Sequence, residues 1–381
     1  MVETGMRLRR EDRSLLSEWW FSVDRLMLGA IMLIMMAGLL VSVAASSPPI
    51  AAQRDLGAFY FAKRQVLFFF PAVLIMIFVS LLDPKSLRRA ALSIFFICIV
   101  LMVMVLVIGA EVNGAQRWIL IGGLSLQPSE FAKPAFVLLA AWLFAQRYSY
   151  PDMPATQIAL GVYGIFALLL ILQPDVGQAL LITMVWGGLF FFAGLSWRWV
   201  GILAGSSVAG LIVAYSALPH VANRINRFIS PDTGDSFQMK RALESFRIGG
   251  WTGRGAGEGK IKFSLPDSHT DFIFAVVAEE FGIIACLILL VLFAFVVIRG
   301  FMRALNEPDA FIRLSIVGLT MLFGLQAIIN MSVNLALIPA KGMTLPFISY
   351  GGSSMLAMGL TMGMLLGLMR QQSGYFTDNR A

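Results

Sequence analysis

Runs of about twenty apolar residues recur along the whole of this chain. A helix of that length spans the hydrocarbon core of a bilayer, because each residue adds about 1.5 Å. Only 13% of the 381 residues are charged, against about 25% in a soluble domain. The pattern therefore predicts an all-α polytopic membrane protein and leaves no room for a second, soluble domain.

Ten such spans are predicted, flanked by short polar ends. The spans are residues 26–45, 65–82, 90–110, 128–147, 155–172, 176–194, 199–218, 279–298, 314–335 and 345–369. Segment 1–25 precedes the membrane domain, 26–369, and a tail, 370–381, follows it. An even number of spans puts both ends on one side. Lys and Arg are concentrated in the short loops of that side, which assigns both termini to the cytoplasm.

The longest polar segment is the predicted outer loop, residues 219–270. Its net charge is +3, eight basic minus five acidic residues. This charge suits an anionic lipid headgroup, or it is ordinary solubilising charge. Apolar residues at helical spacing within it, 239–246, predict a short amphipathic helix on the membrane surface. The glycine-rich run 249–260 lacks the nucleotide-binding spacings and predicts a flexible or tightly turned loop.

Several acids follow in the stretch 263–282. Twenty residues counted outward from Arg299 place Glu279 and Glu280 at the outer hydrocarbon edge, where a structural role suits them. Asp271 then lies about 12 Å further out if the helix continues, at headgroup depth. The alternative for Asp271 is an acid favoured by the helix dipole. The helix cap would come from one of three nearby side chains, Asp267, Ser268 or Thr270.

Other polar residues fall in the outer half of the membrane. Glu130 and Lys133 lie one turn apart inside a span and can form an ion pair. Asp175 occupies a hairpin that reads as a simple turn. The segment 344–354 contains Pro and Gly-Gly, which predicts a broken helix lining a cavity, or close packing through small residues. Few polar residues fall in the inner half of the predicted spans. The sequence therefore favours a site facing the outer leaflet over a midplane transport site.

Four motifs, in this order, resemble the SEDS family: RWILIGGLSLQPSEFAKP, QPDVGQ, KFSLPDSHTDFIFAVVAEEFG and IPAKGMTLPFISYGGSS. The resemblance implies a ten-helix peptidoglycan glycosyltransferase that polymerises lipid II outside the cytoplasmic (inner) membrane of a bacterium. It also implies a class B penicillin-binding protein as transpeptidase partner. The chain is more similar to the division member than to the elongation member, which implies other division proteins as partners and a place at the septum.

The resemblance also implies roles for particular residues. Asp271 would be the catalytic acid, and Trp118, Glu130 and Lys133 would line the substrate cavity. In the mechanism we expect, Asp271 acts as general base on the attacking sugar hydroxyl. The lipid pyrophosphate leaving group needs cations. The further substrate-binding candidates are Arg224, Arg227, Lys260, Lys262, His269, Ser353 and Ser354.

A divalent cation, Mg or Mn, could share the charge of the pyrophosphate, but no metal-ligand spacing is visible and the chain has only two histidines. Lipid II and membrane lipid are the expected ligands, and no nucleic acid is expected. Three alternatives stay open. The chain could be a lipid II flippase, which needs a polar track reaching the inner half; an elongation-type polymerase; or a division scaffold that binds partners through its helix faces.

Overall fold

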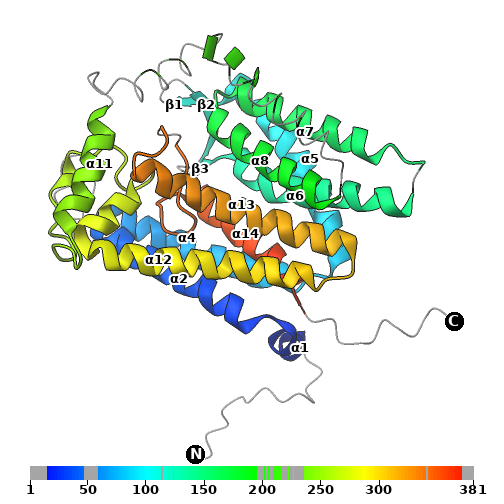
Figure 1. Ribbon diagram of the computed structural model, residues 1–381, viewed down its shortest axis with the longest axis horizontal. Helices are drawn as coiled ribbons and strands as arrows, with labels where there is room; N and C mark the ends of the chain where they lie inside the picture. The colour runs from blue at the N-terminus through cyan, green and yellow to red at the C-terminus, as the bar shows by residue number, and fades with distance from the viewer. Residues whose placement is uncertain are drawn as a thin grey trace, which may run out of the picture.

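The computed structural model describes residues 15–46, 59–112, 115–122, 124–150, 152–194, 236–339 and 342–370, with scattered positions between 201 and 226. Helices dominate this part of the chain (Figure 1). They are α1 Leu15–Ser22, α2 Arg25–Ala45, α4 Tyr60–Ser80, α5 Pro84–Ile108, α6 Pro128–Ser149, α7 Ala155–Leu172, α8 Val176–Phe192, α11 Ser236–Gly249, α12 Ile273–Leu305, α13 Ala310–Asn334 and α14 Gly352–Leu368. A 3-10 turn, Ile261–Phe263, precedes α12.

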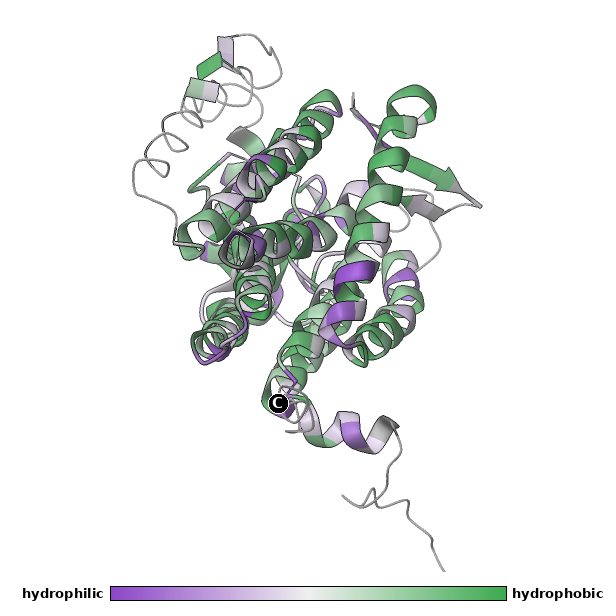
Figure 2. Ribbon diagram, turned by 90° about the vertical axis from the view of Figure 1, so that its right-hand side faces the viewer, coloured by the Kyte–Doolittle hydropathy of each residue, from purple (hydrophilic) through white to green (hydrophobic). Residues whose placement is uncertain are grey.

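Six described helices are long and apolar enough to cross a bilayer: α2, α4, α5, α7, α12 and α13. Two shorter apolar helices, α8 and α14, accompany them, and α6 coincides with a predicted span. Figure 2 shows that the helices are hydrophobic along most of their length. The protein is therefore a mostly helical membrane fold. The predicted span 199–218 lies largely outside the described residues.

The connection from α5 to α6 folds as a small sheet that the sequence did not predict. Strands β1 (Ala110–Val112), β2 (Ala115–Ile121) and β3 (Leu124–Leu126) pair antiparallel in that order. The register sets Ala110 opposite Trp118 and Ile119 opposite Leu126. Side chains alternate along a strand, so Arg117 and Trp118 point to opposite faces of β2.

Close packing between α4 and α14 depends on glycines of α14. A Cβ atom at Gly359 would lie 2.6 Å from the carbonyl oxygen of Ala72, and one at Gly363 would lie 2.7 Å from that of Met76. Helices in lipid gain little from hydrophobic contact, so small residues that let backbones approach stabilise their association. The predicted close packing through small residues is thus present: it occurs within the predicted segment at Gly352, where a Cβ would lie 2.5 Å from the Phe68 ring, and it continues along α14.

The segment before α14 is the predicted broken helix. Residues 342–351 are not helical, and Leu345 to Ser349 are buried. The predicted span 345–369 was therefore wrong at its start, because the helix begins only at Gly352. Local side chains satisfy the buried backbone: the Leu345 amide donates to Ser349 Oγ at 2.7 Å. Buried irregular backbone needs such partners in a membrane.

The described ends of the chain lie close together. Arg370, just after α14, donates from Nε to Ser22 Oγ at 2.9 Å and from Nη1 to the carbonyl of Leu81 at 3.0 Å. Arg299 near the end of α12 pairs with Asp24 at 2.8 Å. These contacts show that the start of α2 and the ends of α12 and α14 lie on the same side of the protein. In Figure 1, α11 lies at the opposite end of α12.

Helix α12 is broken at Gly282, where φ is 79° and ψ is 178°. The amides beyond the break leave the helix pattern: Ile283 donates to the carbonyl of Gly250 at 2.9 Å, and Ile284 donates to that of Trp251 at 3.2 Å. The glycine-rich loop is thereby fixed to α12. It is tightly turned, as one of the two predictions stated, with positive φ at Gly253, Gly255 and Gly257.

We expect Gly282→Ala to destabilise the protein, because this φ and ψ region is accessible essentially to glycine alone. A Cβ atom there would also lie 2.3 Å from the Trp251 carbonyl oxygen. The strain alone costs about 1–3 kcal/mol, which thermal unfolding of the purified protein in detergent would detect as a lower melting temperature. Gly187→Ala is the matched control, since a Cβ there meets nothing within 4 Å. Equal melting temperatures for the two variants would contradict the expectation.

Candidate functional site

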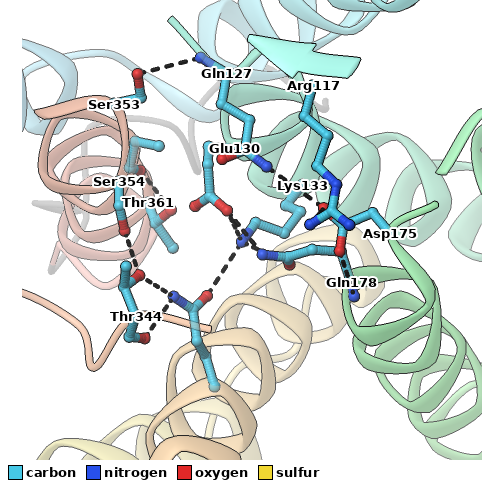
Figure 3. A network of polar contacts seen from close by, with 12 residues as sticks. Arg117, Gln127, Glu130, Lys133, Asp175, Gln178, Thr344, Ser353, Ser354 and Thr361 are labelled. Atoms are coloured by element: carbon cyan, nitrogen blue, oxygen red, sulfur yellow. Dashed lines mark hydrogen bonds and ion pairs between the residues drawn. The ribbon is translucent and has the colours of Figure 1, made fainter. Parts of the chain in front are cut away.

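Lys133 joins three helices through one buried ammonium group. Its Nζ lies 2.8 Å from Glu130 Oε1 on α6, 3.0 Å from Gln178 Oε1 on α8 and 3.2 Å from Gln326 Oε1 on α13. Gln178 also donates to Glu130 Oε1 at 2.9 Å. Figure 3 shows the side chains of Glu130, Lys133 and Gln178 converging. The predicted ion pair is therefore present, and the Lys133 side chain is only 1% exposed.

The second oxygen of the Glu130 carboxylate differs from the first. Glu130 Oε2 is buried and has no hydrogen-bond partner among the described residues. A buried carboxylate oxygen without a donor is costly. A donor from a ligand would therefore be stabilising at this atom.

The network continues into the segment before α14. Gln326 Nε2 donates to the carbonyl oxygen and to Oγ1 of Thr344, at 3.1 and 3.2 Å. Thr344 Oγ1 lies 2.7 Å from Ser354 Oγ. Ser353 Oγ donates to the Ser125 carbonyl at 2.7 Å and accepts from the Gln127 amide at 3.2 Å. The hydroxyls of Ser353 and Ser354 thus connect α14 to the sheet and to α13.

The hairpin between α7 and α8 is more than the simple turn that its sequence suggested. Asp175 is buried, caps α8 at the Gln178 amide, and lies 3.6 Å from Arg117 Nη1. Gln127 Nε2 donates to Asp175 Oδ2 at 3.4 Å. Burial raises the pKa of Asp175, and the charge of Arg117 opposes this shift. The hairpin is therefore fixed against β2 and the start of α6.

Asp271 lies in a turn immediately before α12. Its carbonyl oxygen accepts hydrogen bonds from Asn330 Nδ2 at 3.0 Å and Asn334 Nδ2 at 2.9 Å. Asn334 Oδ1 also accepts from the Ala275 amide at 2.9 Å. The Asn334 side chain therefore accepts from the first turn of α12, where the Ala275 amide also donates to the Phe272 carbonyl at 3.1 Å. The predicted cap by Asp267, Ser268 or Thr270 was wrong, because the N-cap residue is Phe272 and no side chain of that turn serves.

The depth estimate for Asp271 assumed a continuous helix, and this assumption was wrong. The break at Gly282 and the start of α12 at Ile273 remove the regular rise of about 1.5 Å per residue between Asp271 and the membrane. The position of Asp271 is instead set from α13, through the two asparagines.

Asp271 and the Lys133 network lie along one face of α13. Gln326 contacts Lys133 and Thr344, and Asn330, one turn later, donates to the carbonyls of Asp271 and Met343 at 3.0 and 2.7 Å. Neighbouring residues of one irregular segment, Met343 and Thr344, thus accept from the side-chain amides of Asn330 and Gln326. A Cβ atom at Gly342 would lie 3.7 Å from Asp271 Oδ2. The sequence prediction that these polar residues converge is consistent with this arrangement.

His269 is buried beside this segment. Its ring stacks on Phe61 with centroids 4.0 Å apart, and Tyr350 packs against Phe61 at 5.1 Å. The Tyr350 amide donates to the His269 carbonyl at 2.9 Å, and Ser349 Oγ donates to the Thr270 carbonyl at 2.6 Å. These contacts hold residues 269–271 against the segment that carries Thr344.

The lysines and arginines predicted to bind substrate lie in different environments. Lys262 is enclosed: its Nζ donates to the carbonyls of Ala44 and Gly257, at 3.0 and 3.1 Å, and pairs with Glu280. This arrangement leaves its ammonium with protein partners and argues against a contact with pyrophosphate. The Lys260 side chain is exposed. Arg224 and Arg227 lie outside the described residues.

The glutamates after the loop have the structural role that the sequence suggested. Glu279 accepts from the amides of Lys260, Ile261 and Lys262, at 2.6 to 3.3 Å. Glu280 Oε2 accepts from the Gly257 amide at 3.0 Å. Together they hold the loop against α12.

The predicted amphipathic helix is present as α11, but its apolar face packs on protein. Ala242 is fully buried against Leu265, Phe272 and Ala275. Phe246 packs against Phe274 with ring centroids 5.8 Å apart. The helix therefore braces the turn that carries Asp271.

Trp118 and the divalent cation are the remaining predicted features of the site. Trp118 on β2 is half-buried. No group of three His, Cys, Asp or Glu side chains suited to a metal ion occurs among the residues that the structure describes. Sequence reasoning missed Gln178 and Gln326, and the available signal was an uncharged amide within an apolar run.

A family model described as cell cycle protein, covering FtsW, RodA and SpoVE, matches residues 24–374. The chain belongs to this family. The family is the one that the four motifs indicated. Among curated relatives, the probable peptidoglycan glycosyltransferase FtsW of Caulobacter vibrioides is 47% identical over 370 residues, covering 96% of this chain and 94% of the relative. The FtsW protein of Trichlorobacter lovleyi, described in the same words, is 36% identical and covers 86% and 88%.

Two solved structures have a similar fold. One describes the structural coordination of polymerization and crosslinking by a peptidoglycan synthase complex; its chain has a TM-score of 0.77 and 27% identity, covering 92% of this chain and 98% of that one. The other is the rod shape determining protein RodA of Thermus thermophilus, with a TM-score of 0.68 and 26% identity, covering 92% and 97%. The membrane fold of the FtsW/RodA/SpoVE family is thus shared along nearly the whole length.

Proposed function

We propose that this protein is a peptidoglycan glycosyltransferase that polymerises lipid II at the outer face of the cytoplasmic membrane. The observation that carries the proposal is the joint positioning of Asp271 and the Glu130–Lys133 pair by one face of α13. The similarity to probable peptidoglycan glycosyltransferases along 96% of the chain supports the same activity.

In the proposed reaction, one lipid-linked disaccharide is the donor and a second supplies the attacking hydroxyl. The hydroxyl oxygen forms a bond to the anomeric carbon of the donor, and the Asp271 carboxylate takes the proton. The bond from that carbon to the lipid pyrophosphate breaks. Lys260, Arg224 and Arg227 are the cations proposed for the pyrophosphate, and the Glu130–Lys133 pair is proposed to shape the substrate site electrostatically. His269, Ser353, Ser354 and Trp118 are proposed to shape the substrate site.

The proposal includes an orientation and a cellular place. Ten spans with residues 1–25 and 370–381 in the cytoplasm and the loop 219–270 outside agree with the Lys and Arg distribution and with the contact between Arg370 and Ser22. The similarity to the division relative favours action at the septum, with other division proteins. A class B penicillin-binding protein is the proposed transpeptidase partner.

Polymerisation of fluorescent lipid II by the purified protein with its partner tests the proposal. We expect glycan strands that a muramidase digests. A flippase would instead move labelled lipid II across a liposome membrane without forming polymer. Transport without polymer would overturn the proposed activity.

A further inference from the structure

A cavity of about 460 Å³ opens where the start of α2 meets the end of α12, on the predicted cytoplasmic side. This volume lies within the range of small-molecule sites, about 300–1,000 Å³. The cavity is far from the site described above along α12, since it lies beside Arg299 and Arg303 and not beside the Asp271 turn. It has no part in the proposed polymerisation.

Cations outnumber acids in the lining of this cavity. Arg25, Arg299 and Arg303 face it together with one acid, Asp24, so the net charge is three minus one, or +2. Arg299 and Arg303 lie one turn apart on α12 and share a face. The Asp24 carboxylate already has protein partners. It caps α2 at the Met27 amide, 3.0 Å away, and accepts from Arg299 Nε at 2.8 and 2.9 Å. The remaining charge suits an anion.

Arg303 is the cation that the protein leaves unsatisfied. Its Nε is buried and has no hydrogen-bond partner within the described residues. A buried donor without an acceptor is costly, and a guanidinium matches the geometry of a phosphate oxygen pair. Arg25 is exposed, and its guanidinium lies over the rings of Trp20 and Phe21 at 5.2 and 5.4 Å.

Apolar residues complete the lining. Leu26 is 62% exposed and Met302 is 58% exposed, on the two helices that form the cavity. An apolar wall beside a basic pocket fits a molecule with an anionic head and a hydrocarbon tail. Basic pockets between membrane helices on the cytoplasmic side are suited to anionic lipid headgroups.

We propose that this cavity binds the phosphate headgroup of an anionic phospholipid of the inner leaflet, with Arg303 and Arg25 as its contacts and Leu26 and Met302 against the acyl chain. The bound lipid would bridge α2 and α12 next to the Asp24–Arg299 pair. The partner is thus a structural lipid, distinct from the lipid substrate of the proposed reaction.

Native mass spectrometry of the full-length protein, released from detergent after addition of phosphatidylglycerol, tests this site. One basic residue near a membrane surface is worth about fivefold in affinity for an anionic lipid. We therefore expect Arg303→Gln to weaken phosphatidylglycerol binding about fivefold, and Arg25→Gln to do the same if Arg303→Gln fails to fold. Arg89→Gln is the matched control, an exposed arginine at the predicted cytoplasmic start of α5 that does not line the cavity.

Two further probes identify the ligand chemistry. Phosphatidylcholine with the same acyl chains should bind less well than phosphatidylglycerol, because its headgroup has no net charge. Inorganic phosphate at millimolar concentration should not displace the bound lipid. Equal lipid binding by the arginine variants and the Arg89→Gln control would overturn the proposal, and so would displacement by inorganic phosphate. Neither result depends on polymerase activity, so failure here is distinguishable from failure of the proposed function.

Discussion

Asp271→Asn should reduce lipid II polymerisation by about 10²–10⁴-fold, the contribution of a general base. Asparagine keeps the size and shape of the side chain but cannot take the proton from the attacking hydroxyl. The bonds from Asn330 and Asn334 should persist, because they go to the carbonyl oxygen of residue 271 and not to its carboxylate. Gel-resolved glycan products per unit time, together with the melting temperature, measure both effects.

The matched control for this variant is Asp267→Asn. Asp267 is an exposed acid of the same turn, and its φ of 52° is one that asparagine adopts readily. We expect unchanged polymerisation and melting temperature for Asp267→Asn. Wild-type polymerisation by a folded Asp271→Asn variant would exclude Asp271 as the base and leave the role of the turn structural.

The membrane helices could be predicted from the sequence because a helix that contacts lipid must be apolar, whichever other helices it packs against. The helices α2, α5 and α7 begin or end within a few residues of the predicted spans for this reason. The charged pair Glu130 and Lys133 was likewise visible, since charge in an apolar run is costly whatever it contacts.

The errors arose where tertiary contacts decide the backbone. Gly282 adopts its conformation because the loop carbonyls of Gly250 and Trp251 accept the amides beyond it, across about thirty residues of chain. Nothing local distinguishes this glycine from Gly187 inside a regular helix. The start of α14 was misplaced for a similar reason, because the buried segment before it obtains its hydrogen bonds from Ser349 and from the turn at residues 269–270.

The contact partners of the candidate residues could not be predicted from the sequence either. The i, i+3 spacing predicts the contact between Glu130 and Lys133. The contacts of Lys133 with Gln178 and Gln326 depend on how α6, α8 and α13 are rotated about their axes, which hydropathy does not define. Lys262 was expected near the substrate on charge alone, and only the packed loop shows that Glu280 is its partner.

Lys133→Met should destabilise the protein by about 3–5 kcal/mol, the usual cost of breaking a buried ion pair from one side. Methionine fills much of the same space, but the Glu130 carboxylate then keeps only Gln178 as a donor. Equilibrium unfolding in detergent measures the loss. The matched control is Arg241→Gln, which removes a pair of the same i, i+3 spacing on α11. That pair is 36% and 41% exposed, so its loss should cost less than about 1 kcal/mol.

A second change separates the structural role of this pair from its role in the reaction. In the double variant Glu130→Gln, Lys133→Met, no uncompensated charge is buried, and replacing both partners of a buried pair is often close to neutral. Most of the lost stability should therefore return. Polymerisation should not, because the pair proposed to shape the substrate site is still missing, and we expect it to stay at about one tenth of wild type or less, a barrier increase of at least about 1.4 kcal/mol. Wild-type polymerisation by the stable double variant would show that the pair only joins α6 to α8 and α13 and has no part in shaping the substrate site.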